Sequence, residues 1–143
     1  MNKKRIEEMI PIAMEILNSE KEEIKDIIQK KDGEKVLISK YDGYIASYGP
    51  TIRQSGLMQA VNFHENHKTG DRKKINDLIV NILKDSGFIG GDESSNLSKL
   101  VMNYDSDPAK KSKITILILE AITACKLAMR TFKKEKPEGG SHD

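Results

Sequence analysis

Apolar residues recur every three or four positions along most of the chain, which is the spacing of one face of an α-helix. The first stripe predicts a helix over residues 4–17, which Pro11 should kink or restart because proline lacks a backbone donor. The apolar pattern then predicts a second helix through 18–32, and Gly33 should stop it. A third helix is expected from about Glu34 to Gly49-Pro50.

Residues 50–65 predict a single turn, "PTIRQS", followed by a new helix. Gly56 is expected to take a positive φ between them, since glycine has no Cβ to clash in that conformation. The new helix has an apolar face made of Leu57, Ala60, Val61 and His64.

The second half of the chain predicts three more helices. The first follows Asp71, a plausible N-cap, and has the cleanest apolar stripe of the protein, which is Ile75, Leu78, Ile79, Ile82 and Leu83. A short helix is expected at "NLSKLVMNY", and Asp107-Pro108 should begin the last one. Residues 114–122 of that helix are apolar nearly all round, which predicts a central position. No stretch alternates with a period of two strongly enough to outcompete a helix. The expected fold is therefore all-α, a compact bundle of about six helices.

The length of 143 residues favours one domain, which we place at residues 1–136, with a disordered tail at 137–143. Residues 18–33 are weakly apolar and are expected to be a mobile arm or an insertion. The single cysteine, Cys125, cannot form an internal disulfide, no apolar run approaches the ~20 residues of a membrane span, and the first residues do not resemble a signal peptide. These features predict a cytoplasmic protein.

The net charge of +2 hides an uneven distribution, because residues 108–136 contain eight Lys or Arg against two acids. Lys126, Arg130 and Lys133 are spaced to share one stripe of the last helix, and Glu120 is expected on the same polar side. Arg72, Lys73 and Lys74 lie near a helix start, where the helix dipole disfavours cations and a bound anion would relieve them. A solvated polar face and a phosphate-binding surface explain these charges about equally well. No aromatic residue lies between the basic residues, so any nucleic-acid contact should be to the backbone.

Side chains that could carry catalysis are few and each has an ordinary structural explanation. His64 and His67 have a spacing that metal ligands use, but no third ligand follows at a diagnostic distance. Asp105 and Asp107 could hold Mg²⁺, although a helix cap before Pro108 explains them better. Cys125 lies among apolar residues of the last helix without an activating neighbour. We therefore expect no catalytic residue, no metal and no cofactor. A small metal-dependent nuclease built from these histidines and aspartates stays open as an alternative.

The stretch "SYGPTIRQSGLMQAVNF", residues 47–63, resembles the signature of the small subunit of type III-B (Cmr) CRISPR effector complexes. The residues that carry this resemblance are Gly56, Leu57, Gln59, Ala60 and Phe63, with Ile52 before them. The last helix, "EAITACKLAMRTF", is similar to the closing helix of that family, with Glu120, Ala121 and Leu127 in place.

The resemblance implies a non-catalytic subunit of an RNA-guided antiviral complex. Copies of such a subunit stack along the backbone subunits that hold the CRISPR RNA, next to the large subunit, and contact the guide–target RNA duplex through its phosphates. Arg53, Gln54 and Gln59 would then bond to a neighbouring subunit or to a phosphate. The small subunit of the type III-A (Csm) complex is the closest rival, which the Gly-Leu-x-Gln-Ala stretch disfavours. A helical adaptor that touches no nucleic acid is a further alternative.

Overall fold

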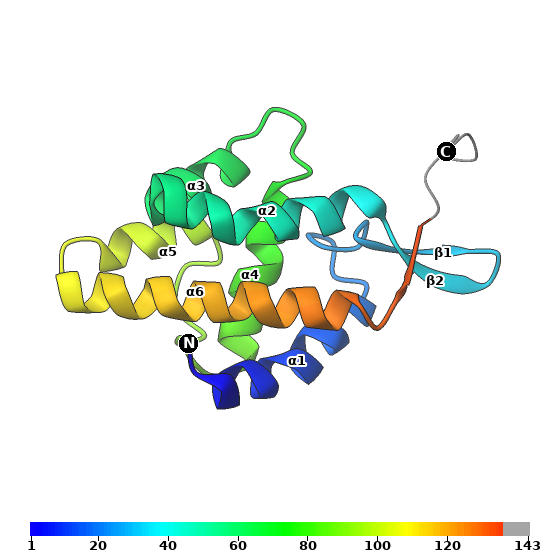
Figure 1. The fold of residues 1–143 in the computed structure, drawn as a ribbon, viewed down its shortest axis with the longest axis horizontal. Helices are drawn as coiled ribbons and strands as arrows, with labels where there is room; N and C mark the ends of the chain where they lie inside the picture. The colour runs from blue at the N-terminus through cyan, green and yellow to red at the C-terminus, as the bar shows by residue number, and fades with distance from the viewer. Residues whose placement is uncertain (136–143) are drawn as a thin grey trace.

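The computed structural model describes residues 1–135, which form six helices and a small sheet (Figure 1). The helices are α1 (Lys3–Asn18), α2 (Ser39–Ser55), α3 (Leu57–Glu65), α4 (Lys73–Asp85), α5 (Leu97–Tyr104) and α6 (Pro108–Met129). The strands are β1 (Ile28–Lys31), β2 (Glu34–Leu37) and β3 (Lys133–Lys134). The predicted bundle of about six helices is confirmed, and the sheet is an addition that the apolar pattern did not indicate. The predicted tail, 137–143, lies outside the described residues.

Helix α6 lies at the centre of the fold and packs against α1, α2, α4 and α5 (Figure 1). Its buried side chains include Ile114, Ile118, Ala121 and Cys125, all fully enclosed. The predicted central position of this helix is therefore confirmed. Part of its apolar surface nevertheless reaches solvent through Ile116 and Leu127.

The segment expected as a second helix is instead a series of turns followed by a β-hairpin. Strand β1 pairs antiparallel with β2, and β3 adds to β2 in parallel, with Val36 opposite Lys133. The hairpin turn is Asp32-Gly33, where both residues have positive φ, at 54° and 82°. An Asp-Gly pair between two strands favours such a turn, because its backbone twist matches that of the strands. The helix predicted over 18–32 was therefore wrong, and Asp-Gly was the signal against it.

Buried apolar residues attach the 18–33 segment to the core, where Ile24 and Ile27 are almost completely enclosed. Backbone bonds from Ile27 to the carbonyl of Ile24, and from Ile38 to that of Ile27, hold the chain as it enters and leaves the hairpin. The mobility expected of this segment stays a prediction.

Helix α2 continues through Gly49-Pro50, where the sequence predicted its end. Pro50 lacks the amide that would bond to the preceding turn. The helix persists because Tyr41, Ile45, Tyr48 and Ile52 bury one continuous face on both sides of the proline. Packing of this face outweighs the missing bond. The helix ends at Ser55, and the φ of +90° at its C-cap, Gly56, confirms the predicted positive value.

The two predicted N-caps have different outcomes. Asp107 caps α6 by accepting bonds from the amides of Ala109 and Lys110, as expected. Asp71 does not cap α4, because Arg72 occupies the N-cap position. The Asp71 carboxylate instead binds the Lys40 ammonium at 2.8 Å.

Glu120 lies inside the protein and not on the polar side of α6, which corrects the prediction. Its carboxylate accepts bonds from Arg5 Nε at 2.7 Å, Arg5 Nη2 at 2.9 Å and the Asn2 amide at 2.6 Å. Burial by itself would raise the pKa of this carboxyl, but the bonds from Arg5 and Asn2 outweigh it and lower the pKa. This ion pair fixes the start of α1 to the middle of α6.

Candidate nucleic-acid interface

The basic stripe predicted for the last helix is shorter than expected. Helix α6 ends at Met129 and Arg130 is its C-cap, so Lys133 lies in β3 and not on the helix. The Lys133 ammonium is 3.0 Å from Glu34 on β2. Because three residues cannot share a helical stripe when one is in a strand, only Lys126 and Arg130 keep the predicted arrangement.

Lys126 and Arg130 line a groove of about 460 Å³ between the end of α6 and the first half of α2. Lys134 also lines it, bound to the Asp42 carboxylate of α2 at 3.0 Å. Apolar side chains complete the lining, namely Leu37, Ile45, Ala46, Met129 and Phe132. The groove therefore presents two cations that have no acidic partner among residues 1–135, beside an apolar wall.

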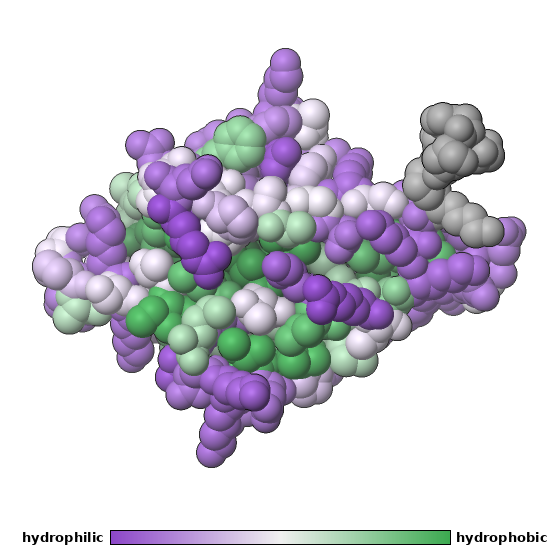
Figure 2. Space-filling view, in the orientation of Figure 1, coloured by the Kyte–Doolittle hydropathy of each residue, from purple (hydrophilic) through white to green (hydrophobic). Residues whose placement is uncertain are grey.

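The same surface continues along α2. Asp42, Ala46, Gly49 and Arg53 are spaced by four, three and four residues, so they follow one face of the helix. A β-carbon at Gly49 would lie 3.8 Å from Arg53 Nη1, which places the guanidinium along this face. Arg53 forms no ion pair within residues 1–135. We call Arg53, Lys126 and Arg130 the seam cations. Figure 2 shows hydrophobic surface along α6, bordered by hydrophilic side chains.

The cations at the start of α4 are mostly neutralised by the protein itself. Lys73 lies 3.1 Å from Asp77 and 3.5 Å from Glu65, and Lys74 lies 3.3 Å from Asp26. Burial lowers the pKa of Lys73, but its bonds to these two carboxylates outweigh burial and leave the pKa raised. The relief predicted from a bound anion is therefore already supplied by neighbouring carboxylates.

Arg72 differs from these two lysines because its side chain has no acidic partner within residues 1–135. Its guanidinium carbon lies 4.3 Å from the ring centre of Tyr44 and 5.0 Å from that of Phe63. Its Nε atom is buried without a hydrogen-bond partner in the described part of the chain. The sequence missed this contact, because Tyr44, Phe63 and Arg72 come from three different segments. The one available signal was that Phe63 lies off the apolar face of its helix.

Gln54 and Gln59 are both exposed, and neither side chain forms a hydrogen bond to residues 1–135. Gln54 lies in the last turn of α2, whereas Gln59 lies on α3, one helical turn before Phe63. Their amides are therefore available to other molecules. The site residues predicted from the sequence thus occupy separate surfaces rather than one.

The residues considered for a nuclease do not converge. His64 is buried, its ring is stacked on Tyr48 at 3.8 Å, and its Nδ1 lies 2.9 Å from the Ala60 carbonyl. His67 Nδ1 faces Thr69, and Asp105 binds Lys111 at 3.3 Å. Burial also raises the pKa of the enclosed Cys125 thiol. Within residues 1–135, no three His, Cys, Asp or Glu side chains gather where they could hold a metal ion.

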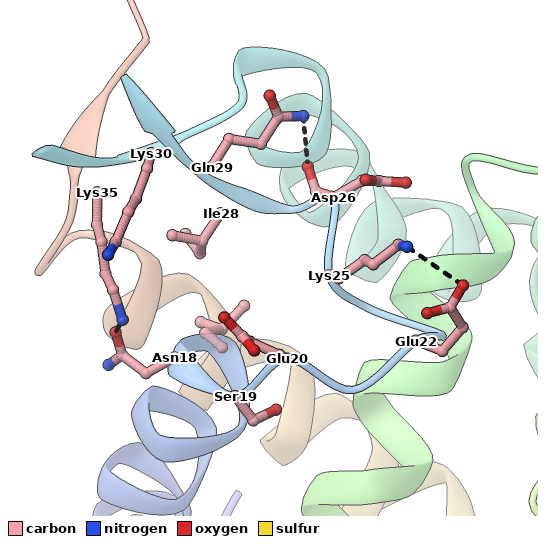
Figure 3. Close-up of a pocket in the computed structure, with 11 residues that line it drawn as sticks. Asn18, Ser19, Glu20, Glu22, Lys25, Asp26, Ile28, Gln29, Lys30 and Lys35 are labelled. Carbon is pink, nitrogen blue, oxygen red and sulfur yellow. Dashed lines mark hydrogen bonds and ion pairs between the residues drawn. The ribbon is translucent and has the colours of Figure 1, made fainter. Parts of the chain in front are cut away.

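A second hollow, of about 540 Å³, lies between the end of α1, the turns that follow it and β1 (Figure 3). Its charged lining combines three lysines with three acids, namely Lys25, Lys30, Lys35, Glu20, Glu22 and Asp26. Lys25 binds Glu22 at 3.2 Å, and Lys35 donates to Asn18 at 2.8 Å. Because its charges largely cancel one another, this hollow favours no single class of ligand.

The fold and these surfaces define a small, mostly helical protein. Along its α2–α6 seam lie cations that have no acidic partner within residues 1–135, and elsewhere an arginine is held against two aromatic rings. None of its helices within residues 1–135 is long and apolar enough to cross a membrane.

The model of the CRISPR-associated protein (Cas_Cmr5) family matches residues 15–129, which is most of the chain. The protein therefore belongs to this family, the small subunits of type III-B Cmr complexes. The match includes the whole of the 47–63 stretch and most of 120–132. Comparison with curated proteins and with solved structures gives no match.

Proposed function

We propose that this protein is a non-catalytic small subunit of a type III-B RNA-guided effector complex. In this proposal, copies stack along the backbone subunits next to the large subunit and contact the duplex of CRISPR RNA and target RNA through its phosphates. The observation that carries the proposal is the family match over residues 15–129. The separate positions of His64, His67, Asp105 and Asp107 support a role without catalysis.

The seam cations are the residues that we assign to the duplex. A cation that already pairs with a carboxylate of its own chain must give up that partner before it can neutralise a phosphate. Lys73, Lys74 and Lys133 have such partners, whereas the seam cations have none among residues 1–135. Phosphate contacts of this kind release counterions and do not depend on base sequence. Arg53, Lys126 and Arg130 are therefore expected to contribute more than the paired lysines.

The test reverses the charge of two seam cations in the reconstituted complex, with the double variant Lys126→Glu, Arg130→Glu. Retention of target RNA should weaken to a similar extent for every guide sequence. The slope of log affinity against log salt should flatten by roughly one unit for each phosphate that the variant no longer neutralises. Filter binding or fluorescence anisotropy over a salt series measures both quantities.

The matched control is Lys3→Glu, Lys4→Glu, which changes the charge equally at two exposed lysines of α1, away from the seam. It should leave target retention close to that of the unaltered complex. Glu120→Lys is unsuitable as a control, because it would place a cation at a buried position next to Arg5.

Two results would contradict the assignment. If the seam variant fails to join the complex when no target is present, these residues form a protein interface. If seam and control variants both retain target RNA normally, the seam does not contact the duplex, and the adaptor alternative gains support.

A further inference from the structure

Phe63 is the one aromatic residue within 1–135 whose side chain is largely exposed, at 50%. It lies on α3, whose buried face is made of Leu57, Ala60, Val61 and His64. The core therefore does not require an aromatic ring at this position. A single exposed apolar residue is common on protein surfaces and carries no function by itself.

The surroundings of Phe63 make its exposure informative. The guanidinium of Arg72 lies over its ring and over that of Tyr44, with distances of 5.0 and 4.3 Å to the two ring centres. The attraction between a cation and aromatic faces orients the guanidinium, whose N–H donors lie in its own plane. The Nε–H is buried, so the two terminal amino groups are the donors that could meet a ligand. No carboxylate within residues 1–135 pairs with Arg72, because Asp71 binds Lys40 and Glu65 binds Lys73 and Asn76. The arginine is therefore held in place with its charge unsatisfied.

Polar groups that suit a nucleobase lie near Phe63 along the chain. Gln59 is exposed one turn before Phe63 on the same helix, and its amide offers both a donor and an acceptor. The His67 ring meets Phe63 edge-on, with 5.5 Å between ring centres. Asn62 and Asn66 are also exposed, although the Asn62 amide oxygen already accepts a bond from Ser98 Oγ at 2.8 Å. Aromatic residues and Arg are also enriched at protein interfaces, so the feature that favours a nucleobase here is the exposed Gln59 amide near the ring.

We propose that Phe63, Arg72 and Gln59 form a binding site for an unpaired RNA nucleotide. The base stacks on the exposed part of the Phe63 ring and extends the Tyr44–Arg72–Phe63 column, while the outward edge of the Arg72 guanidinium binds a phosphate of the same strand. Gln59 hydrogen-bonds the edge of the base. Aromatic side chains next to cations hold single-stranded nucleic acid in this way, with little sequence preference.

This inference rests on the proposed function, because it assumes that RNA runs along the subunit. It differs from that proposal in its ligand, an unpaired nucleotide instead of a duplex, and in the surface of the protein that binds it. Tyr44 lies on the side of α2 away from Arg53 and the other seam cations, since the two residues are nine positions apart, or two and a half helical turns. An unpaired nucleotide on one side of α2 and a duplex on the other would contact different residues.

The test uses the purified full chain and a short single-stranded, adenine-rich RNA that carries one 2-aminopurine, whose fluorescence is quenched by stacking. The unaltered protein and Phe63→Tyr should bind this RNA and quench the fluorescence. Phe63→Leu keeps an apolar side chain without a ring, so it should bind about tenfold more weakly and lose the quenching. Arg72→Gln should weaken binding and flatten the salt slope by about 0.7, as expected for one contact to a single strand. Adenosine monophosphate as a competitor shows whether one free nucleotide is enough or a strand is required.

The outcomes separate this inference from the proposed function. If Phe63→Leu binds and quenches like the unaltered protein, or if the unaltered protein gives no quenching at all, the nucleotide site is wrong. Target retention by the complex with unaltered seam cations would still support the proposed function. If Phe63→Leu instead prevents assembly in the absence of RNA, the ring belongs to a protein interface, which also overturns the inference.

Discussion

Tyr48 and Asn76 form a buried hydrogen bond that joins α2 to α4, and its removal should have a defined cost. Both residues are fully enclosed, and the Tyr48 hydroxyl donates to Asn76 Oδ1 at 2.5 Å. Asn76 Nδ2 donates in turn to the Val61 carbonyl at 3.1 Å and to Glu65 Oε1 at 3.0 Å. One amide therefore connects α4 to both α2 and α3.

Tyr48→Phe keeps the ring and its stacking on His64 but leaves Asn76 Oδ1 buried without a donor. Such an orphaned acceptor costs about 1–3 kcal/mol in free energy of unfolding. Asn76→Leu should cost more, because it leaves the Tyr48 hydroxyl without an acceptor and also removes the bonds to Val61 and Glu65. The double variant should cost less than the sum of the two, by about 0.5–3 kcal/mol, since the second change removes a group that the first had already orphaned.

Urea unfolding followed by far-UV circular dichroism measures these free energies. Tyr44→Phe is the matched control, because Tyr44 is half-buried and its hydroxyl has no hydrogen-bond partner among residues 1–135. It should change stability by less than about 0.5 kcal/mol. The reasoning fails if Tyr48→Phe lowers the free energy of unfolding no more than this control does. It also fails if the costs of Tyr48→Phe and Asn76→Leu are fully additive in the double variant.

Three more substitutions, at His64, Gly56 and Gly43, should change stability in defined directions. Burial lowers the pKa of His64, and the charges of Arg72 and His67 lower it further. The folded protein therefore favours the neutral ring, and the stability that results is fully present above the ordinary pKa of 6.5. This stability should be lost as pH falls through the lowered pKa, and His64→Phe should reduce the loss in urea titrations between neutral and mildly acidic pH. Gly56→Ala should cost about 1–3 kcal/mol because of its φ of +90°. Gly43→Ala, inside α2 with open space around it, should stabilise by about 0.5–1 kcal/mol, and equal effects of the two glycine variants would contradict the backbone argument.

The helices that the sequence placed well are those with a clear apolar stripe or a clear start. Helix α4 follows the stripe predicted for it, and α3 begins directly after the positive φ of Gly56. In α3 a helical period alone separates the buried face from the exposed one. In α4 the period predicted the helix, but residues 75–80 are all buried, so contacts with the rest of the fold enclose sides that the stripe did not mark.

The predictions that were wrong concern segments whose structure depends on contacts with distant parts of the chain. The apolar residues Ile24 and Ile27 fit a helical spacing, yet they lie in the turns before the hairpin and are buried in the core from there. In α6, where nearly every side of the helix is apolar, periodicity could not show that Glu120 faces Arg5 of α1. Lys133 was assigned to the helix because its spacing fits, but β2 pairs with that segment as a strand.

The stretch that carried the resemblance contains residues of two kinds, and the structure separates them. Leu57 and Ala60 are buried, at 5% and 0% exposure, so packing against the core explains them. Gln59 and Phe63 are exposed on the same helix, and the core gives no reason for an amide and a ring there. A helical period predicts the first kind, because burial repeats along the chain. It cannot predict the second, because the partner of Phe63 is Arg72, which follows a loop and is held in turn by Tyr44 of another helix. For this reason the sequence led to backbone contacts alone, whereas the structure brings an arginine and two aromatic rings together, the arrangement that we propose binds an unpaired base.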